Sequence, residues 1–215
     1  MSSSANAPLV DIRNLTVRFT RGARPPHATR IGGRITVDGI DVMALGRKAL
    51  ADYRGAQVAM IFQEPLTALD PVYSLGDQIV EAIRRHESVT VADARKRALE
   101  LFERVRIPSP ERRLAAFPHE MSGGMRQRAM IALALACRPK LLLADEPTTA
   151  LDATVQIQVL LLLRELQREL GLAVVFVTHD LGAAVEVADR IAVMRHATGA
   201  HRGRAWPRGA LSANS

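Results

Sequence analysis

Cysteine and aromatic residues are scarce in this sequence. Its 215 residues include a single cysteine, Cys137, and aromatic residues make up 4% of the chain. One cysteine excludes an internal disulfide, and its position in the apolar run IALALAC predicts a packed core residue and not a nucleophile. A reducing, cytosolic compartment fits this usage. The low aromatic content argues against an interpretation based on stacking of nucleic-acid bases.

Lysine is also rare, although the chain is basic. The net charge is +7, and the only lysines are Lys48, Lys96 and Lys140, so arginine supplies most of the positive charge. Such an excess suits nucleic acid, an anionic membrane surface or simple solubility. The basic residues are scattered through the body of the chain and become dense only at 195–208. This distribution favours an ordinary solvated surface, and we expect no nucleic-acid partner.

Long apolar runs are absent as well. No stretch approaches the ~20 apolar residues that a membrane-spanning helix needs. The opening MSSSANAPLV lacks the basic region and apolar core of a signal peptide. If the protein works at a membrane, we therefore expect it to be a peripheral subunit.

What is present is an alternation of short apolar runs with amphipathic segments. This order predicts an α/β fold, with a parallel sheet, covering helices and a helical insertion. We expect an edge strand at 10–19 and a further strand from residue 33, separated by a loop at 21–32. We also expect buried strands at 57–62, 141–144 and 173–177, and a last strand at 191–194. We expect helices that Ser74 and Thr90 cap, and further helices at 124–137, 152–170 and 181–188.

Two acids follow the apolar run LLLA that begins at Leu141. A buried strand fixes Asp145 at its carboxyl end, where this carboxylate can hold Mg²⁺. The next residue, Glu146, can polarise a water for in-line attack on a γ-phosphate. This arrangement is the Walker B motif of nucleotide-hydrolysing proteins. Alone it is a moderate signal, because a strand that runs into an acidic turn also occurs by chance.

Four further motifs surround these acids. The segment IFQEP contains Gln63, MSGGMRQR begins at Met121, PTTALD ends at Asp152, and VTHD contains His179. Taken singly, each has a structural explanation, such as a helix cap or an ordinary loop residue. Together, in this order and spacing, they resemble the ATP-binding subunits of ATP-binding cassette (ABC) transporters, whose core is a P-loop NTPase-like sheet with a helical subdomain.

The resemblance implies a role for each motif. Gln63 corresponds to the glutamine that approaches Mg²⁺ together with Asp145, and Glu146 and His179 correspond to catalytic residues, the histidine contacting the γ-phosphate. The remaining nucleotide-binding residues belong to the signature loop and the D-loop; they are Ser122, Gly123, Gly124, Gln127 and Asp152. In the signature loop the two glycines let the backbone approach phosphate at the N-terminus of a helix. The implied ligands are ATP and Mg²⁺.

The sequence after Gln63 indicates a particular class of ABC transporter. The run PLTALDPVYSLGDQI is similar to the ATPases of oligopeptide and dipeptide importers. The resemblance covers residues 9–194, which we take as the ATPase domain, with a helical subdomain at about 74–138, and 195–215 is expected to be a disordered or divergent tail. It implies partnership with integral-membrane permease subunits and a second ABC ATPase subunit, and a peripheral position at the cytoplasmic face of the plasma (inner) membrane.

One motif of the family does not occur in the sequence. The phosphate-binding loop, Walker A, has the form GxxxxGK(S/T), and none of the three lysines is followed by serine or threonine. We expect that a central strand, this loop and the first helix are missing near residues 21–24. We therefore expect negligible ATPase activity from the chain alone, since backbone N–H groups and the lysine of this loop hold the phosphates.

Two other functions remain open. The chain is a non-catalytic partner or a degenerate remnant that lends only its signature loop to another subunit, or it is an ABC ATPase of DNA maintenance, where its positive charge would have a use. Nucleotide binding distinguishes the first alternative from an active importer ATPase. Salt-dependent DNA binding would favour the second, which the importer-like segment after Gln63 opposes.

Overall fold

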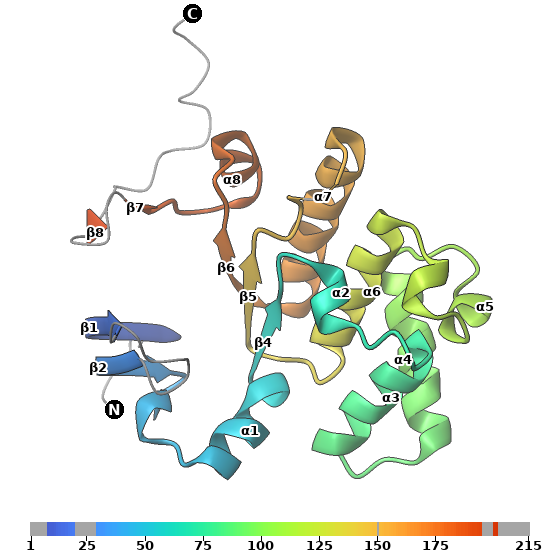
Figure 1. Cartoon of the computed structure of the whole chain (residues 1–215), viewed down its shortest axis with the longest axis horizontal. Helices are drawn as coiled ribbons and strands as arrows, with labels where there is room; N and C mark the ends of the chain where they lie inside the picture. The colour runs from blue at the N-terminus through green and yellow to red at the C-terminus, as the bar shows by residue number, and fades with distance from the viewer. Residues whose placement is uncertain (1–7, 20–28, 150, 195–199, 202–215) are drawn as a thin grey trace, which may run out of the picture. The chain divides into compact units, whose positions relative to one another are not determined.

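The computed structural model describes residues 8–19, 29–149, 151–194 and 200–201 (Figure 1). The chain divides into two compact units, residues 1–54 and 55–215. Most of the expected tail, 195–215, and of the expected loop, 21–32, lies outside the described residues. The expected boundaries of the ATPase domain, 9–194, and of its helical subdomain, 74–138, stay predictions.

The first unit contains an antiparallel sheet. Its strands are β1 (Val10–Phe19), β2 (Thr29–Val37) and β3 (Ile40–Asp41), paired in this order. Gly33 lies opposite a shift in the β1 register and has a φ of +101°; a side chain there would meet the carbonyl oxygen of Asn14 at 2.5 Å. Because β2 begins at Thr29, the expectation of a loop up to Gly32 is wrong for its last four residues, which pair with β1 and lengthen the hairpin.

A short helix follows this sheet. The 3-10 helix η1 (Val42–Ala44) precedes α1 (Arg47–Ala56), which begins in the first unit. Tyr53 is the only buried residue of α1, and its hydroxyl donates a hydrogen bond to the carbonyl oxygen of Val37 over 3.3 Å. A helix that buries one side chain leaves no apolar stripe in the sequence, which explains why the pattern did not predict α1.

The second unit contains a parallel sheet. Its strands β4 (Val58–Ile61), β5 (Leu141–Asp145) and β6 (Ala173–Val177) pair in the order β4-β5-β6. The register aligns Met60 with Leu143 and Leu143 with Val175. The predicted strands at 57–62, 141–144 and 173–177 are thus confirmed to within a residue or two. All three run in the same direction, so the loops that leave their carboxyl ends lie at one edge of the sheet.

The two faces of this sheet differ. Ile61 and Leu142 have no exposed surface and pack in one cluster with side chains of α6 (Gly123–Leu135) and α7 (Ala153–Leu170). On the opposite face, Met60 is 40% exposed and Val175 44% exposed. The prediction that 173–177 is buried is therefore wrong for Val175 and Val177, because their side chains lie on the exposed face of the sheet.

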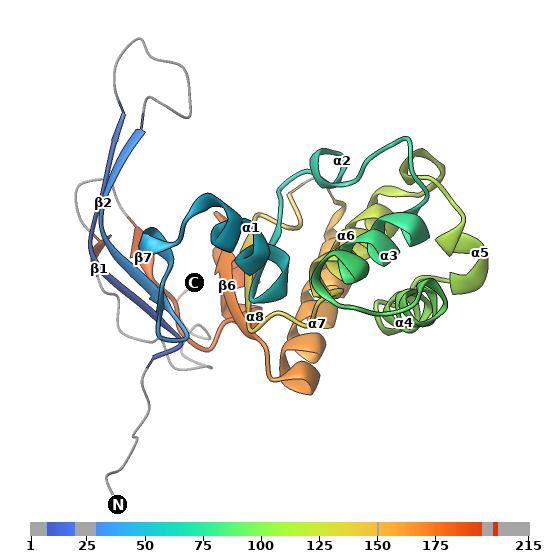
Figure 2. The same cartoon turned by 90° about the horizontal axis from the view of Figure 1, so that it is seen from below.

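Helices form a group beside the parallel sheet (Figure 2). The predicted caps are confirmed: the hydroxyl of Ser74 accepts from the N–H of Asp77 over 3.1 Å, and that of Thr90 accepts from the N–H of Asp93 over 3.1 Å. Each helix turns an apolar stripe to a shared core. The helices between β4 and α6 are α2 (Pro65–Ala68), α3 (Leu75–His86), α4 (Val91–Arg104), α5 (Pro110–Leu114) and the 3-10 helix η2 (Pro118–Glu120).

After β6 the chain forms α8 (Leu181–Val187), which packs on α7. The strand predicted at 191–194 is confirmed only as β7 (Val193–Met194), which pairs antiparallel with β8 (Ala200–His201). These last two residues belong to the tail that we expected to be disordered or divergent, and that expectation stays a prediction. None of the described helices is long and apolar enough to cross a bilayer.

Candidate functional site

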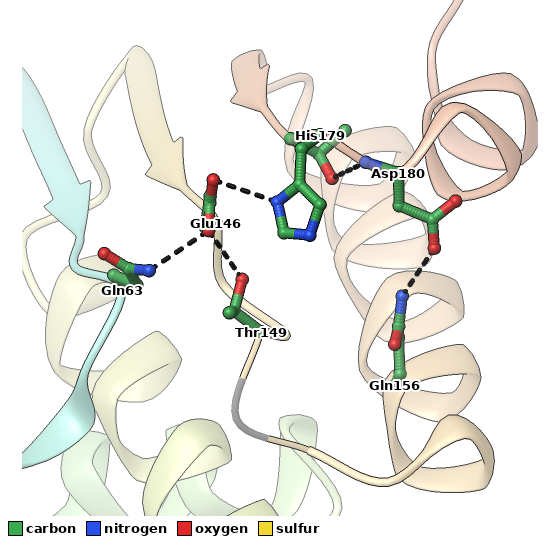
Figure 3. Close-up of polar contacts among 7 residues, drawn as sticks. Gln63, Glu146, Thr149, Gln156, His179 and Asp180 are labelled. Atoms are coloured by element: carbon green, nitrogen blue, oxygen red, sulfur yellow. Dashed lines mark hydrogen bonds and ion pairs between the residues drawn. The ribbon is translucent and has the colours of Figure 1, made fainter.

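The polar residues predicted from three separate motifs meet at the carboxyl edge of the parallel sheet (Figure 3). Gln63 follows β4, Glu146 follows β5 and His179 follows β6. The Gln63 amide Nε2 lies 3.1 Å from Oε2 of Glu146, and the His179 Nδ1 lies 3.0 Å from its Oε1. The hydroxyl of Thr149 donates to Oε2 over 2.8 Å. The carboxylate of Glu146 is therefore the centre of the site.

The backbone fixes the position of this carboxylate. The N–H of Glu146 donates to the carbonyl oxygen of Val177 over 3.0 Å, which extends the pairing of β5 and β6 by one bond. Glu146 has a φ of +44°, a left-handed conformation that is unfavourable for a residue with a side chain. The chain thus turns sharply as it leaves β5, and the turn directs the Glu146 side chain toward Gln63 and His179 (Figure 3).

The surroundings of Glu146 favour its ionised form. The hydrogen bond with His179, and then the bond from the Thr149 hydroxyl, lower the pKa of Glu146 below its ordinary value. An ionised carboxylate can accept a proton, which is what a general base requires. The imidazole of His179 is 71% exposed, so it can also face a ligand from outside the chain.

Asp145 lies beside this cluster at the last position of β5. It is half-buried, and no side chain or N–H in the described part of the chain hydrogen-bonds to its carboxylate. The described residues contain no group of three or more His, Cys, Asp or Glu side chains that would hold a metal ion by themselves. A single free carboxylate nevertheless suits Mg²⁺, which proteins commonly bind through one or two carboxylates together with substrate phosphates and water.

The predicted signature loop begins a helix, as expected. Ser122 is the N-cap of α6, and its hydroxyl accepts from the N–H of Met125 over 3.4 Å. A side chain at Gly123 would meet only Leu151, at 3.7 Å, whereas one at Gly124 would lie 2.7 Å from Cγ1 of Val155. A side chain thus has room at Gly123 but not at Gly124, and the expected approach of phosphate to both glycines stays a prediction. Gly124 is small because α7 packs against it.

Gln127 occupies a different environment from the exposed start of α6. It is 1% exposed, and its amide Nε2 has no hydrogen-bond partner in the described part of the chain. It lines a pocket of about 320 Å³ between the loop after β4, the first turns of α6 and the loop after β5. The other lining residues are Gln63, Glu64, Pro65, Gly123, Arg126, Pro147 and Leu151. The structure thus brings the Gln63 and Ser122 segments to one pocket.

Asp152 lies apart from the Glu146 cluster. It is the N-cap of α7, and its Oδ1 accepts from the N–H of Val155 over 3.0 Å. Its predicted contact with nucleotide stays a prediction.

Three residues around the site were not predicted as site residues: Thr149, Gln156 and Asp180. Thr149 lies within the PTTALD motif, and Asp180 has the sequence context of a helix cap, so both had a local signal. Gln156 had none, because its partner is 24 positions away in sequence.

Comparison with protein families identifies the class. The family model for the ABC transporter matches residues 20–149, which is more than half of the chain. The chain therefore belongs to the ABC transporter family.

Individual relatives carry names of peptide transport proteins. The chain is 52% identical over 167 residues to a probable peptide ABC transporter ATP-binding protein of Sinorhizobium fredii, a match that covers 78% of this chain and 50% of that protein. It is 52% identical over 162 residues to the oligopeptide transport ATP-binding protein OppD of Bacillus subtilis, covering 75% and 45%. The chain thus spans about half the length of the curated relatives it matches.

Solved structures confirm the fold class. The ADP- and phosphate-bound dimer of the cassette MJ0796 matches with a TM-score of 0.64 and 31% identity, over 72% of this chain and 66% of that chain. The cbiO1 protein of Clostridium perfringens matches with a TM-score of 0.64 and 28% identity, over 74% and 60%. The fold is that of an ABC ATPase, with a parallel sheet and helices, and this class of protein uses ATP and Mg²⁺.

The hydrogen bonds at Glu146 make a prediction about its pKa. His179→Ala is expected to raise the pKa of Glu146, because the ionised form loses the donor that lowers it most, and Thr149→Val is expected to raise it less. Carbon-13 NMR of the Glu146 carboxyl through the acid range measures both shifts. Thr154→Val is the matched control. It changes an exposed threonine in the first turn of α7 and is expected to leave the pKa of Glu146 unchanged. An unchanged pKa in His179→Ala would show that the contact does not form in solution.

The packing of Gly124 makes a second prediction. Gly124→Ala is expected to destabilise the chain by about 1–3 kcal/mol, because the new methyl group overlaps Val155, and Val155→Ala in the same chain is expected to relieve part of this loss. Urea denaturation measures the free energy of unfolding. Gly123→Ala is the control and should change it by less than about 0.5 kcal/mol, since nothing lies within contact distance except Leu151. Equal effects at the two glycines would contradict this packing.

Proposed function

We propose that this chain is the ATP-binding, energy-coupling subunit of an ABC importer for peptides or related solutes, and that its own ATP site is defective. The observation that carries the proposal is the Glu146 carboxylate, held at the carboxyl edge of the sheet by donors from Gln63, Thr149 and His179. A base at this edge, with a histidine and a glutamine in contact, suits the activation of a water beside a terminal phosphate.

The proposed roles follow the geometry. Glu146 accepts the proton of the attacking water, and its lowered pKa keeps it ionised for this step. His179 holds the side of Glu146 that faces β6 and contacts the γ-phosphate through its exposed ring. Asp145, free of other partners in the described part of the chain, holds Mg²⁺ with Gln63, whose amide oxygen points away from Glu146 (Figure 3). Mg²⁺ would neutralise the charge on the phosphates.

The proposed defect concerns the groups that hold the phosphates. The sequence has no GxxxxGK(S/T) segment, so it lacks the nest of N–H groups and the lysine that bind the β- and γ-phosphates in P-loop proteins. The outer side of β6 supports the idea of a missing strand and helix: among the described residues this strand has one neighbour, and Val175 and Val177 are 44% and 52% exposed. Parallel sheets normally have both faces covered.

The relatives support the assignment to an importer and its partners. Their names describe peptide, oligopeptide and dipeptide transport, and one solved cassette that this chain resembles is a dimer. For this chain we propose integral-membrane permease subunits and a second ABC ATPase subunit as partners, and a peripheral position at the cytoplasmic face of the inner membrane. The peptide-transport names of these relatives, together with the importer-like segment after Gln63, are the reason why we favour an importer over an ATPase of DNA maintenance.

One observation favours a second, non-catalytic function. The space around Gly123 is open, and Ser122 caps the N-terminus of α6, so backbone N–H groups there are available to an anion. A chain without its own phosphate loop can still offer this helix N-terminus to the ATP of another subunit. In that case the chain lends only its signature loop, and Glu146 does no chemistry in this chain.

The proposal predicts that the chain alone does not retain ATP. Isothermal titration with Mg²⁺ and ATP is expected to show no binding at micromolar concentration, and turnover is expected to match that of Glu146→Gln protein. The reason is that Asp145, Gln63 and His179 contact only the terminal phosphate and its metal. Micromolar binding that is lost in Asp145→Ala, or turnover that is lost in Glu146→Gln, would contradict the proposed defect.

Mixing the chain with an intact peptide-importer cassette tests whether the chain lends its signature loop to another subunit. If the chain lends its signature loop, the ATP turnover of the mixture falls when Ser122→Arg or Gly123→Asp protein replaces the unaltered chain. A Cβ at Gly123 would meet only Leu151, at 3.7 Å, so Gly123→Asp is expected to alter the exposed helix end and not the fold. Equal turnover with and without the chain would exclude the supporting role.

A further inference from the structure

Asp180 joins the end of β6 to two helices. Its Oδ1 accepts from the N–H groups of Gly182 and Ala183, over 2.8 and 3.1 Å, and so caps α8. Its Oδ2 accepts from the amide Nε2 of Gln156, on the second turn of α7, over 3.1 Å (Figure 3). Its own N–H donates to the hydroxyl of Thr178 over 3.0 Å. Both carboxylate oxygens and the backbone of Asp180 are thus held in place.

This arrangement constrains the neighbouring His179. The imidazole is 71% exposed, and the partner that the structure gives it is Oε1 of Glu146. An exposed side chain on a free loop would lose rotamer entropy on forming this single contact. Because Asp180 is fixed from α7 and α8, the Cα of His179 is already placed for the contact before the ring turns toward Glu146.

We propose that Gln156 is a positioning residue, which acts through Asp180 to hold His179 against Glu146. Gln156 stands on the helix that follows the PTTALD segment, and Thr149 of that segment donates to the same carboxylate. Thr149, in the loop after β5, and Gln156, on α7, therefore act on the contact from its two sides: Thr149 touches Glu146, and Gln156 fixes the side of His179. A partner that displaces the start of α7 would weaken the hold of Gln156 on this contact. This regulatory consequence rests on the proposed function, whereas the contact itself needs no nucleotide.

The test follows the His179 ring by NMR in the free chain. In protein labelled with nitrogen-15 at its six histidines, His179→Gln assigns the ring of interest. All spectra are compared at one fixed pH, and the contact with Glu146 keeps a proton on Nδ1 of the ring. The nitrogen-15 shifts of Nδ1 and Nε2 then report the fraction of rings in contact. Since the readout requires no ATP, its outcome is independent of whether the proposed ATP site is defective.

Four substitutions define the expected results. Gln156→Ala removes the donor and is expected to lower the ratio of bound to free rings about 2- to 10-fold, the range of one ordinary hydrogen bond. Gln156→Glu places a carboxylate beside Asp180 and is expected to lower it further. Gln156→Lys restores a donor and is expected to keep the wild-type shifts. Gln158→Ala is the matched control, an exposed glutamine of the same helix that accepts from Arg128 instead, and should leave them unchanged.

Amide exchange at Gly182 and Ala183, measured in the same samples, shows whether α8 has kept its cap. Shifts that move in Gln156→Ala while these amides stay protected support the positioning role. Wild-type shifts in both Gln156→Ala and Gln156→Glu would overturn it, as would an equal change in Gln158→Ala. If Gln156→Ala unfolds α8, the comparison of Gln156→Lys with Gln156→Glu still decides the question, because lysine can donate to the Asp180 carboxylate whereas glutamate repels it.

Discussion

The site depends on the carboxylate of Glu146 accepting hydrogen bonds from three separate segments of the chain. Gln63, Thr149 and His179 come from the loops after β4, β5 and β6, and no two of these loops are joined except through a helix. They meet because β4, β5 and β6 are parallel and their carboxyl ends share an edge. The buried face of the sheet, with Ile61 and Leu142 against α6 and α7, fixes this edge.

The molecule thus separates two requirements of nucleotide hydrolysis. The groups that would act on the water and the terminal phosphate are assembled at one sheet edge, with Glu146 held ionised by its neighbours. The sequence contains no GxxxxGK(S/T) segment that would hold the remaining phosphates. At the start of α6, the space around Gly123 is open, and Gly124 is packed against Val155. Of these two adjacent glycines, Gly124 allows α7 to pack closely, whereas Gly123 leaves the helix N-terminus open.

Much of this architecture could be predicted from the sequence because its signals are local. Apolar runs of four to six residues predicted β4 and β5, and serine or threonine three residues before aspartate predicted the starts of α3 and α4. The motifs predicted that Gln63, Glu146 and His179 share a site. The structure adds that they touch, and that Glu146 is their common partner.

The features that the sequence did not reveal depend on neighbours distant along the chain. β6 has the composition of a buried strand, but the exposure of Val175 and Val177 is decided by what covers that face of the sheet. Gly124 is explained by a methyl group of Val155 on another helix, and the role of Gln156 by a carboxylate 24 positions later. α1 was missed because it buries a single residue. None of these has a periodic pattern to detect.

The most direct test of the account restores what the sequence lacks. A strand, phosphate loop and helix from a peptide-importer relative are inserted between Arg21 and Arg24, and the binding and hydrolysis of ATP are compared before and after. The account predicts that the inserted chain binds ATP with Mg²⁺ and hydrolyses it, and that Glu146→Gln abolishes hydrolysis while binding persists. An inserted chain that binds ATP but hydrolyses it equally well after Glu146→Gln would contradict the account, as would hydrolysis that depends on Glu146 in the chain without the insertion.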